Sequence, residues 1–434
     1  MFKNIIFGLG VFAALFAMLI FSGRLPIGKG KSANTPIGEV MVWGTLPQNQ
    51  VESLFQAVNA TTKTFRISYQ EIDEANFSTK LLETLASGRG PDLIIAPYQI
   101  ILEQRTRLYS LPPQSISEQQ YRDSYVDGAS IFYNESGALA LPVSVSPLVL
   151  FYNRTLFSNA GIINPPTKWD EFEDVVSKLT ILDKNGRFIQ NGISLGAYNN
   201  IPATKDIIMT LVSQLGQIPV FRNVSGTQEQ LNVLADTPLS SNDSVRPLTS
   251  AARFFTQFAD PNKKTYTWSP LLPTAQDQFL AEKLAMYIGY SDEASLMHAK
   301  NSRVDFGVKF LPQAKDHPTL VTGMKLYGIA TLKRSSNLNG AFATQYLLSG
   351  TQYGPQLAQI ANGFSTLKSV LSQTTSINEE YKKSILVARG WFDINQAKSN
   401  QIIQIMINDI LSGRKNVSEA ADAFVTTLSE SYTR

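Results

Sequence analysis

Short apolar runs and segments with helical spacing alternate along the N-terminal part of the chain. Glu39 to Trp43 predicts a strand, and Phe77 to Ser87 has its apolar residues on one face of a helix. Asp92 to Ala96 is a continuous apolar run, which is typical of a strand buried on both faces. This alternation favours an α/β fold with a mostly parallel sheet. Loops at the carboxyl ends of the strands, Gly44 to Gln48 and Pro97 to Gln99, are then expected to form a binding crevice.

A second pattern, an apolar and β-branched stretch from Leu139 to Tyr152, is interrupted at Ser146-Pro147. Proline lacks the backbone N–H that a sheet needs, so it is confined to edges and irregular points of strands. We therefore predict that this strand leaves one sheet and enters another. The chain has 434 residues, more than a single hydrophobic core usually holds, so a crossing between two lobes is expected here.

The N-terminus carries an uncharged apolar segment from Ile5 to Ser22, which is close to the shortest length for a membrane-spanning helix. A cleavable signal peptide would have a shorter apolar segment and small residues at its cleavage site, which Phe21-Ser22-Gly23 matches poorly. Residues 1–23 are thus predicted to be a single-pass signal anchor, with a signal peptide as the alternative. Residues 24–35 read as a flexible linker, and the body of the protein is expected on the extracytoplasmic side.

Composition argues against several functional classes. The formal net charge is only +3 and there is no long basic run, so no nucleic-acid partner is expected. The chain has no cysteine, which excludes disulfides, thiolate metal sites and cysteine nucleophiles. His298 and His317 lack the spacing of metal ligands, and Gly88 to Pro91 lacks the Lys-Ser/Thr of a phosphate-binding loop. We therefore predict a protein that is not an enzyme and holds no metal and no cofactor.

Aromatic and amide side chains cluster on the loops predicted to lie between the lobes. Sugars present apolar C–H faces and a rim of hydroxyls, so their sites combine flat rings with amide and hydroxyl partners. Packing beside strands is the alternative for Trp43 and Tyr290, and packing near a helix start is the alternative for Trp391. The predicted ligand-binding residues are Trp43, Gln48, Tyr98, Gln99, Tyr198, Asn199, Tyr290 and Trp391.

Five collinear segments resemble the family 1 extracellular solute-binding proteins of bacterial ABC transporters, the relatives of maltose-binding protein. They are Leu85 to Leu93 (LASGRGPDL), Leu141 to Phe172 (LPVSVSPLVLFYNRTLFSNAGI, then NPPTKWDEF), Phe279 to Gly289 (FLAEKLAMYIG), Val304 to Pro312 (VDFGVKFLP) and Ile410 to Ala421 (ILSGRKNVSEAA). The resemblance implies a two-lobe periplasmic-binding-protein-like fold with a three-strand hinge. It implies further crossings at Gly289 to Ser291 and near Leu348 to Thr351. Lobe 1 would comprise residues 36–143 and 292–348, and lobe 2 residues 144–291 and 349–434.

The same resemblance implies the function. A monomeric, membrane-anchored protein would capture a small ligand, a carbohydrate above all, between its lobes and deliver it to ABC permease subunits. A membrane-anchored sensor or surface interaction protein without a transport role remains the alternative.

Individual positions depart from the family pattern. Ser146, which we add to the predicted ligand-binding residues, stands where sugar-binding relatives often keep an acidic side chain. Gln99 and Ile100 stand where maltose-binding relatives place a charged pair, and Asn400 stands where an aromatic platform is common. These departures argue against a maltose-like sugar without affecting the predicted lobes.

Overall fold

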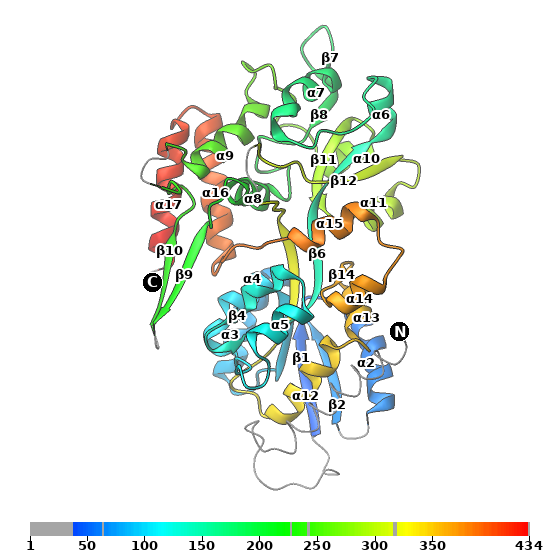
Figure 1. Ribbon diagram of the computed structural model, residues 1–434, viewed down its shortest axis with the longest axis vertical. Coiled ribbons are helices and arrows are strands. Elements are labelled where there is room, and N and C mark those ends of the chain that lie inside the picture. The colour runs from blue at the N-terminus through cyan, green and yellow to red at the C-terminus, as the bar shows by residue number, and fades with distance from the viewer. Residues whose placement is uncertain (1–37, 63–64, 226–227, 241–243, 316–318, 433–434) are drawn as a thin grey trace.

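The computed structural model describes residues 38–62, 65–225, 228–240, 244–315 and 319–432. These residues form two α/β lobes stacked along the long axis of the molecule, with strand β6 running through both (Figure 1). The two-lobe α/β fold predicted from the sequence is thereby confirmed. The predicted anchor and linker, residues 1–35, lie outside the described residues. Among the helices that the structure describes, none is long and apolar enough to cross a membrane.

A ten-stranded sheet connects the lobes in the order β2-β1-β3-β13-β6-β11-β8-β7, and β12 and β14 also pair with β6. The bounds of these strands are β1 Gly38–Gly44, β2 Phe65–Glu71, β3 Leu93–Pro97, β6 Leu141–Asn153, β7 Ile181–Leu182, β8 Phe188–Ile193, β11 Leu284–Tyr290, β12 Phe306–Phe310, β13 Met324–Thr331 and β14 Phe364–Ser365.

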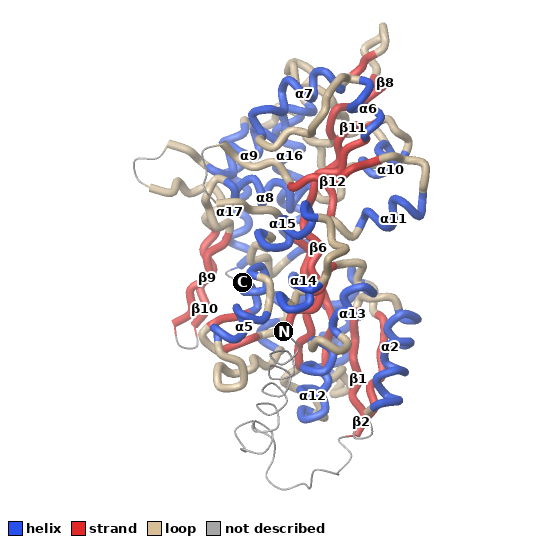
Figure 2. Tube along the Cα trace, turned by 45° about the vertical axis from the view of Figure 1, so that its right-hand side comes forward, coloured by secondary structure: helices blue, strands red, loops and turns tan. Residues whose placement is uncertain are grey.

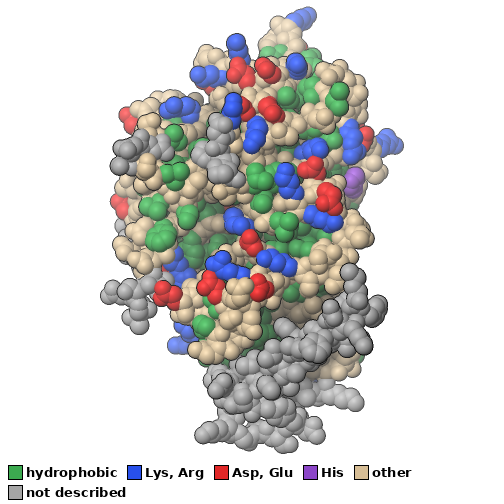
Figure 3. All heavy atoms as spheres, in the orientation of Figure 1, with side chains coloured by type: hydrophobic (Ala, Val, Ile, Leu, Met, Phe, Trp, Pro, Cys, Tyr) green, Lys and Arg blue, Asp and Glu red, His purple; other side chains and the backbone are tan. Residues whose placement is uncertain are grey.

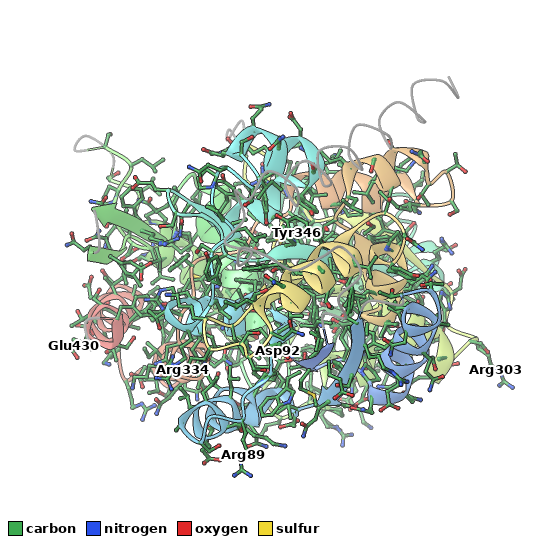
Figure 4. All side chains as sticks on the ribbon, turned by 90° about the horizontal axis from the view of Figure 1, so that it is seen from below. Arg89, Asp92, Arg303, Arg334, Tyr346 and Glu430 are labelled. Carbon is green, nitrogen blue, oxygen red and sulfur yellow. The ribbon has the colours of Figure 1, made fainter. Side chains whose placement is uncertain are left out.

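Lobe 1 is built around β1, which pairs in parallel with β2 and with β3. All five residues of β3 are buried, as the continuous apolar run predicted. Asp92, just before β3, accepts hydrogen bonds from the Met41 backbone N–H and the Ser335 hydroxyl, so its role is structural. In Figure 4, Asp92 lies within the molecule, whereas Arg89 and Arg303 extend outward at its edge. The lobe's helices are α2 Gln48–Thr61, α3 Phe77–Ala86, α4 Tyr98–Glu103, α5 Glu118–Ser124, α12 Leu338–Ser349, α13 Gly354–Ile360 and α14 Lys368–Gln373.

Strand β6 changes partners in its middle. Its residues up to Pro147 pair with β13, whereas residues from Leu148 onward pair with β11 and β12. At the change, the Pro147 carbonyl accepts a hydrogen bond from the Ser291 N–H at 2.9 Å, and the Leu148 N–H donates to Gly323 at 2.8 Å. The predicted crossing at Ser146-Pro147 is therefore present. Proline fits this point because its missing N–H lies where the ladder is interrupted.

The strand pairing differs from the predicted division at the other two crossings. Residues 306–310 of β12 pair with the lobe 2 half of β6, so the chain stays in lobe 2 after Ser291 and returns near Thr322. Residues 364–365 of β14 pair with the lobe 1 half of β6, so the third crossing follows α14 and precedes α15, Glu379–Val387. A short apolar strand can pair with either half of β6, and its pattern does not identify the partner. We propose boundaries that follow the pairing, with lobe 1 as residues 38–147 and 323–374.

Lobe 2 surrounds α8, Thr204–Gln214, which is buried on nearly all sides. Such a helix belongs to the core of a lobe. The other helices of lobe 2 are α6 Arg154–Asn159, α7 Phe172–Leu179, α9 Pro247–Thr256, α10 Ala275–Leu280, α11 Glu293–Lys300, α16 Gln396–Leu411 and α17 Val417–Tyr432. Each lobe also has a small antiparallel hairpin that is separate from the main sheet. In lobe 1 it is β4 Tyr133–Asn134 with β5 Gly137–Ala138, and in lobe 2 it is β9 Val220–Ser225 with β10 Gln228–Val233.

The face drawn in Figure 3 carries Lys and Arg side chains interspersed with Asp and Glu side chains. Mixed charges of this kind create no strong field of one sign over that face.

Candidate ligand-binding cleft

A cavity of about 370 Å³ lies between the lobes and is lined by residues of both. This volume falls within the range of small-molecule sites in proteins. On the lobe 1 side the lining includes Thr45 to Pro47, which follow β1, and Pro97 and Gln99, at and just after the end of β3. Both segments sit at the carboxyl ends of parallel strands, where the crevice was predicted.

The start of α8 supplies two charged residues to the lobe 2 wall, Lys205 and Asp206. The Lys205 ammonium lies 2.8 Å from Asp393 Oδ2 and 3.1 Å from Ser399 Oγ, and 5.5 Å from the centre of the Trp391 ring. Both members of the ion pair are buried, with 7% and 0% of their side chains exposed. The charge of Lys205 is thus balanced locally, which a buried charge requires.

Tyr290, the last residue of β11, lies next to Asp206. Its phenol donates a hydrogen bond to the Asp206 carboxylate. Burial, and then the neighbouring Asp206 charge, raise the pKa of Tyr290 well above its ordinary value, so the phenol keeps its proton. The Lys325 ammonium lies 4.3 Å from the centre of the Tyr290 ring and 3.1 Å from Asp292 Oδ2. The wall therefore presents an oriented ring framed by charges of both signs.

Glu74 faces this group from lobe 1, on the short helical turn Glu74–Asn76. The residue is exposed to the cleft, but the cleft walls desolvate its carboxylate, and this desolvation raises the pKa of Glu74. The positive charge of Lys325 and a hydrogen bond with Gln396 of the opposite lobe lower the pKa of Glu74. Glu74 is thus a carboxylate of lobe 1 that is sensitive to groups from across the cleft.

Three of the predicted ligand-binding residues line the cavity: Gln99, Tyr198 and Tyr290. Asn199 follows Tyr198 but is solvent-exposed, and its side-chain oxygen accepts a hydrogen bond from Gln404. Gln48 lies just beyond the lining residue Pro47, and its amide donates to Glu52 and to the Tyr69 carbonyl. Contact with ligand remains a prediction for each of them.

The other predicted residues are buried away from this cavity. Trp43 packs in the lobe 1 core with 5% of its surface exposed, and Ser146 lies buried in β6. Tyr98 and Trp391 line a separate pocket of about 10 Å³, which is large enough for only one water. The alternative of packing, considered for Trp43 and Trp391, is therefore the one that their burial favours.

Several lining residues were not identified from the sequence. The charged and amide members are Glu74, Lys205, Asp206, Asp292, Lys325, Asn362 and Gln396. One signal was available for two of them, because Lys205 and Asp206 are a charged pair at the start of an otherwise uncharged helix. Asn362 has a positive φ of 53° because it directly follows the C-cap of α13, where the Gly363 N–H donates to the Ala358 carbonyl and asparagine tolerates this conformation. Asn400, noted as a departure from the family, also lines the cavity.

Chemically, the cleft combines tyrosine rings, carboxylates and amides from both lobes. Within the described residues, no group of three or more His, Cys, Asp or Glu side chains could hold a metal ion. The arrangement is that of a two-lobe binding protein whose ligand contacts both walls.

The sequence matches the family of bacterial extracellular solute-binding proteins over residues 53–385. Because this match covers well over half of the chain, the protein belongs to that family. Membership in an extracellular family of binding proteins places its site of action outside the cytoplasm.

Solved structures share this fold. The cyclic α-maltosyl-1,6-maltose binding protein of Arthrobacter globiformis superimposes with a TM-score of 0.70 at 18% identity, over 90% of this chain and 98% of that one. An ABC substrate-binding protein of Listeria monocytogenes in complex with cycloalternan gives 0.68 at 15% identity, over 91% and 99%. A binding protein of Brucella abortus is 22% identical over 132 residues. That alignment covers 30% of this chain and 32% of the Brucella protein's length.

Proposed function

We propose that this protein captures a carbohydrate in the cleft between its lobes and delivers it to the permease of an ABC transporter. The observation that carries the proposal is the cavity of about 370 Å³ whose walls come from both lobes and combine tyrosine rings with carboxylates and amides. The relatives from Arthrobacter globiformis and Listeria monocytogenes are described with cyclic oligosaccharides, which supports a carbohydrate.

The lining residues suit a hydroxyl-rich ligand. Tyr198 and Tyr327 offer ring faces for the C–H surfaces of sugar rings. Glu74 and Asp206 are acceptors for hydroxyl groups, and charge-assisted hydrogen bonds of this kind are the stronger ones. Lys205 uses two of its three N–H groups on Asp393 and Ser399, which leaves one for a ligand oxygen. We infer binding without chemical change of the ligand.

Capture would shift the protein toward the conformation in which both walls contact the ligand. A ligand can favour one conformation only by binding it better than the other, and here the contacts from the second lobe supply that difference. The chain passes between the lobes at a small number of crossings, and such an arrangement permits a hinge motion. The permease would recognise the ligand-bound conformation.

We also propose that the apolar segment from Ile5 to Ser22 holds the protein at the outer face of the cytoplasmic membrane. Its lack of charge and its length support this role.

Thermal unfolding against a panel of mono- and oligosaccharides, with polyols, amino acids and peptides for comparison, tests the function. A ligand that binds only the folded state stabilises it by about 2.7 kcal/mol at a hundred times its dissociation constant. We expect a concentration-dependent rise of the midpoint with one class of saccharide. A rise only with amino acids or peptides would contradict the proposed ligand class.

A further inference from the structure

The β9–β10 hairpin reaches from lobe 2 toward lobe 1. Both Figure 1 and Figure 2 show it extending from the α17 side of lobe 2 down beside lobe 1. Its strands pair with each other and form a two-stranded sheet separate from the main one. The ends of the hairpin, Val220 and Val233, are buried, whereas Phe221 and, with its backbone included, Glu229 are exposed.

One hairpin residue, Glu229, joins the lobes. Its Oε2 lies 2.6 Å from Nε of Arg105 in lobe 1, and its Oε1 lies 2.6 Å from Nε of Arg222 on the facing strand of the hairpin. The three side chains are partly buried, with 19% to 23% of each exposed. A carboxylate held between two guanidinium groups forms charge-assisted hydrogen bonds, which are stronger than hydrogen bonds between neutral groups.

Each arginine of this cluster contacts a segment that belongs to, or neighbours, one wall of the cleft. Arg105 follows α4, the helix that carries the lining residue Gln99, and its Nη1 donates to the Leu102 carbonyl at 3.1 Å. Arg222 lies 5.2 Å from the ring of Phe392, the neighbour of Asp393, which holds Lys205 in the other wall. The cluster therefore connects the two walls from outside the ligand cavity.

The other inter-lobe ion pairs of the described residues have a different location. Lys325 and Asp292 lie beside the crossings, as do Arg389 and Asp127. Pairs beside a hinge persist when the lobes rotate, because the hinge moves least. Neither Arg105 nor Glu229 lies on a segment that crosses between the lobes. Their contact therefore depends on how the two lobes are oriented.

We propose that Arg105 and Glu229 form a latch that sets the ligand affinity of the cleft without contacting the ligand. This inference rests on the proposed capture of ligand between the lobes. The Arg105–Glu229 pair adds to the stability of the conformation in which the walls approach. Ligand affinity depends on the fraction of protein that is competent to bind, so losing the pair weakens binding of every ligand by the same factor. Arg105 and Glu229 are positioning residues, whereas Arg222 pairs with Glu229 within the hairpin and makes no contact between the lobes.

Two neutral variants test the latch by calorimetric titration with the saccharide that raises the unfolding midpoint. We expect Arg105→Gln and Glu229→Gln each to weaken binding by about three- to tenfold, and the double variant to be no weaker than either one. Arg222→Gln is the matched control, because it removes the same charge from the same cluster but leaves the inter-lobe pair. Its affinity should fall less than twofold. Equal losses in Arg222→Gln and Arg105→Gln would overturn the latch, since they would reflect the charge of the region alone.

A second readout needs no ligand. The native chain has no cysteine, so Glu83→Cys on α3 and Ile163→Cys in lobe 2 introduce two unique sites for fluorescent labels. Energy transfer between the labels reports the lobe separation in the ligand-free protein. We expect Glu229→Gln to lower the mean transfer, and 0.5 M NaCl to lower it in the native sequence but much less in the variant. Identical transfer in both proteins would overturn the latch, whereas a failed saccharide panel with a changed transfer would overturn only the proposed ligand.

Discussion

The phenol of Tyr290 donates a hydrogen bond to the carboxylate of Asp206 at the lobe 2 wall of the cleft. The two residues come from different elements, the end of β11 and the first turn of α8, and both line the cavity. The bond fixes the direction of the carboxylate and the plane of the ring at once. A ligand that reaches this wall therefore meets a carboxylate acceptor that is already oriented.

Tyr290→Phe keeps the ring and removes only this hydrogen bond. We expect saccharide binding to weaken about tenfold, which corresponds to about 1.4 kcal/mol, because Asp206 loses its orienting donor. Calorimetric titration measures the change, and Tyr266→Phe, a tyrosine of lobe 2 outside the cleft lining, is the control. An unchanged affinity in Tyr290→Phe would show that the bond does not prepare the site.

The buried pair of Lys205 and Asp393 should contribute more to stability than any exposed ion pair. Asp393→Asn leaves a buried ammonium without its counter-charge, so we expect the free energy of unfolding to fall by about 3 kcal/mol. Urea denaturation measures this loss. The double variant Lys205→Met with Asp393→Leu should lose less than Asp393→Asn alone, because no unpaired charge remains. A larger loss in the double variant would contradict this explanation.

Glu74 should give ligand binding a pH dependence. Desolvation raises its pKa above the ordinary 4.5, and a sugar hydroxyl donates a stronger, charge-assisted hydrogen bond to the ionised carboxylate than to the protonated acid. Affinity is therefore expected to increase as the pH rises through the raised pKa and to stay constant above it. In Glu74→Gln this step should be absent. If the affinity of Glu74→Gln rises over the same pH range, the pH dependence belongs to another titratable group.

The same shift affects folding with the opposite sign. An acid whose pKa is higher in the folded state binds protons more tightly there than in the unfolded chain. The contribution of Glu74 to the stability of the ligand-free protein should thus fall as the pH rises from 4.5 through the folded-state pKa. Denaturation midpoints of the native protein and Glu74→Gln over this pH range measure the effect.

Trp43 distinguishes packing from ligand contact. Because 5% of its surface is exposed and it lies in the hydrophobic core of lobe 1, Trp43→Ala should lower the free energy of unfolding by about 3–5 kcal/mol. The affinity of the protein that remains folded should be unchanged. A loss of affinity in Trp43→Phe at full stability would restore Trp43 to the ligand site.

The sequence was sufficient where a local pattern determines the outcome. The continuous apolar run before Pro97 is a fully buried strand, because both faces of a central strand meet helices. Pro147 marks the crossing, because a residue without an N–H is tolerated where β6 exchanges β13 for β11. The strand with which β12 pairs is determined by residues far away in the sequence. The apolar pattern of β12 alone therefore could not place β12 in lobe 2.

For the cleft, the sequence indicated the loops but not the side chains that face inward. Trp43 and Tyr98 stand at the correct strand ends, yet their side chains are buried away from the cavity, and no periodic pattern gives that direction at a strand end. Lys205 and Asp206 begin a helix that only the tertiary fold brings to the cavity. Glu74 meets groups of the opposite lobe only once the two lobes are placed together.

Calorimetric titration of Asp206→Asn with the saccharide identified by thermal unfolding tests the central claim most directly. Asp174→Asn, an exposed aspartate on α7 outside the cleft, is the matched control. We predict that Asp206→Asn binds at least tenfold more weakly at an unchanged unfolding midpoint, while Asp174→Asn binds like the native protein. Native affinity in Asp206→Asn would contradict capture of the sugar in the cleft between the lobes.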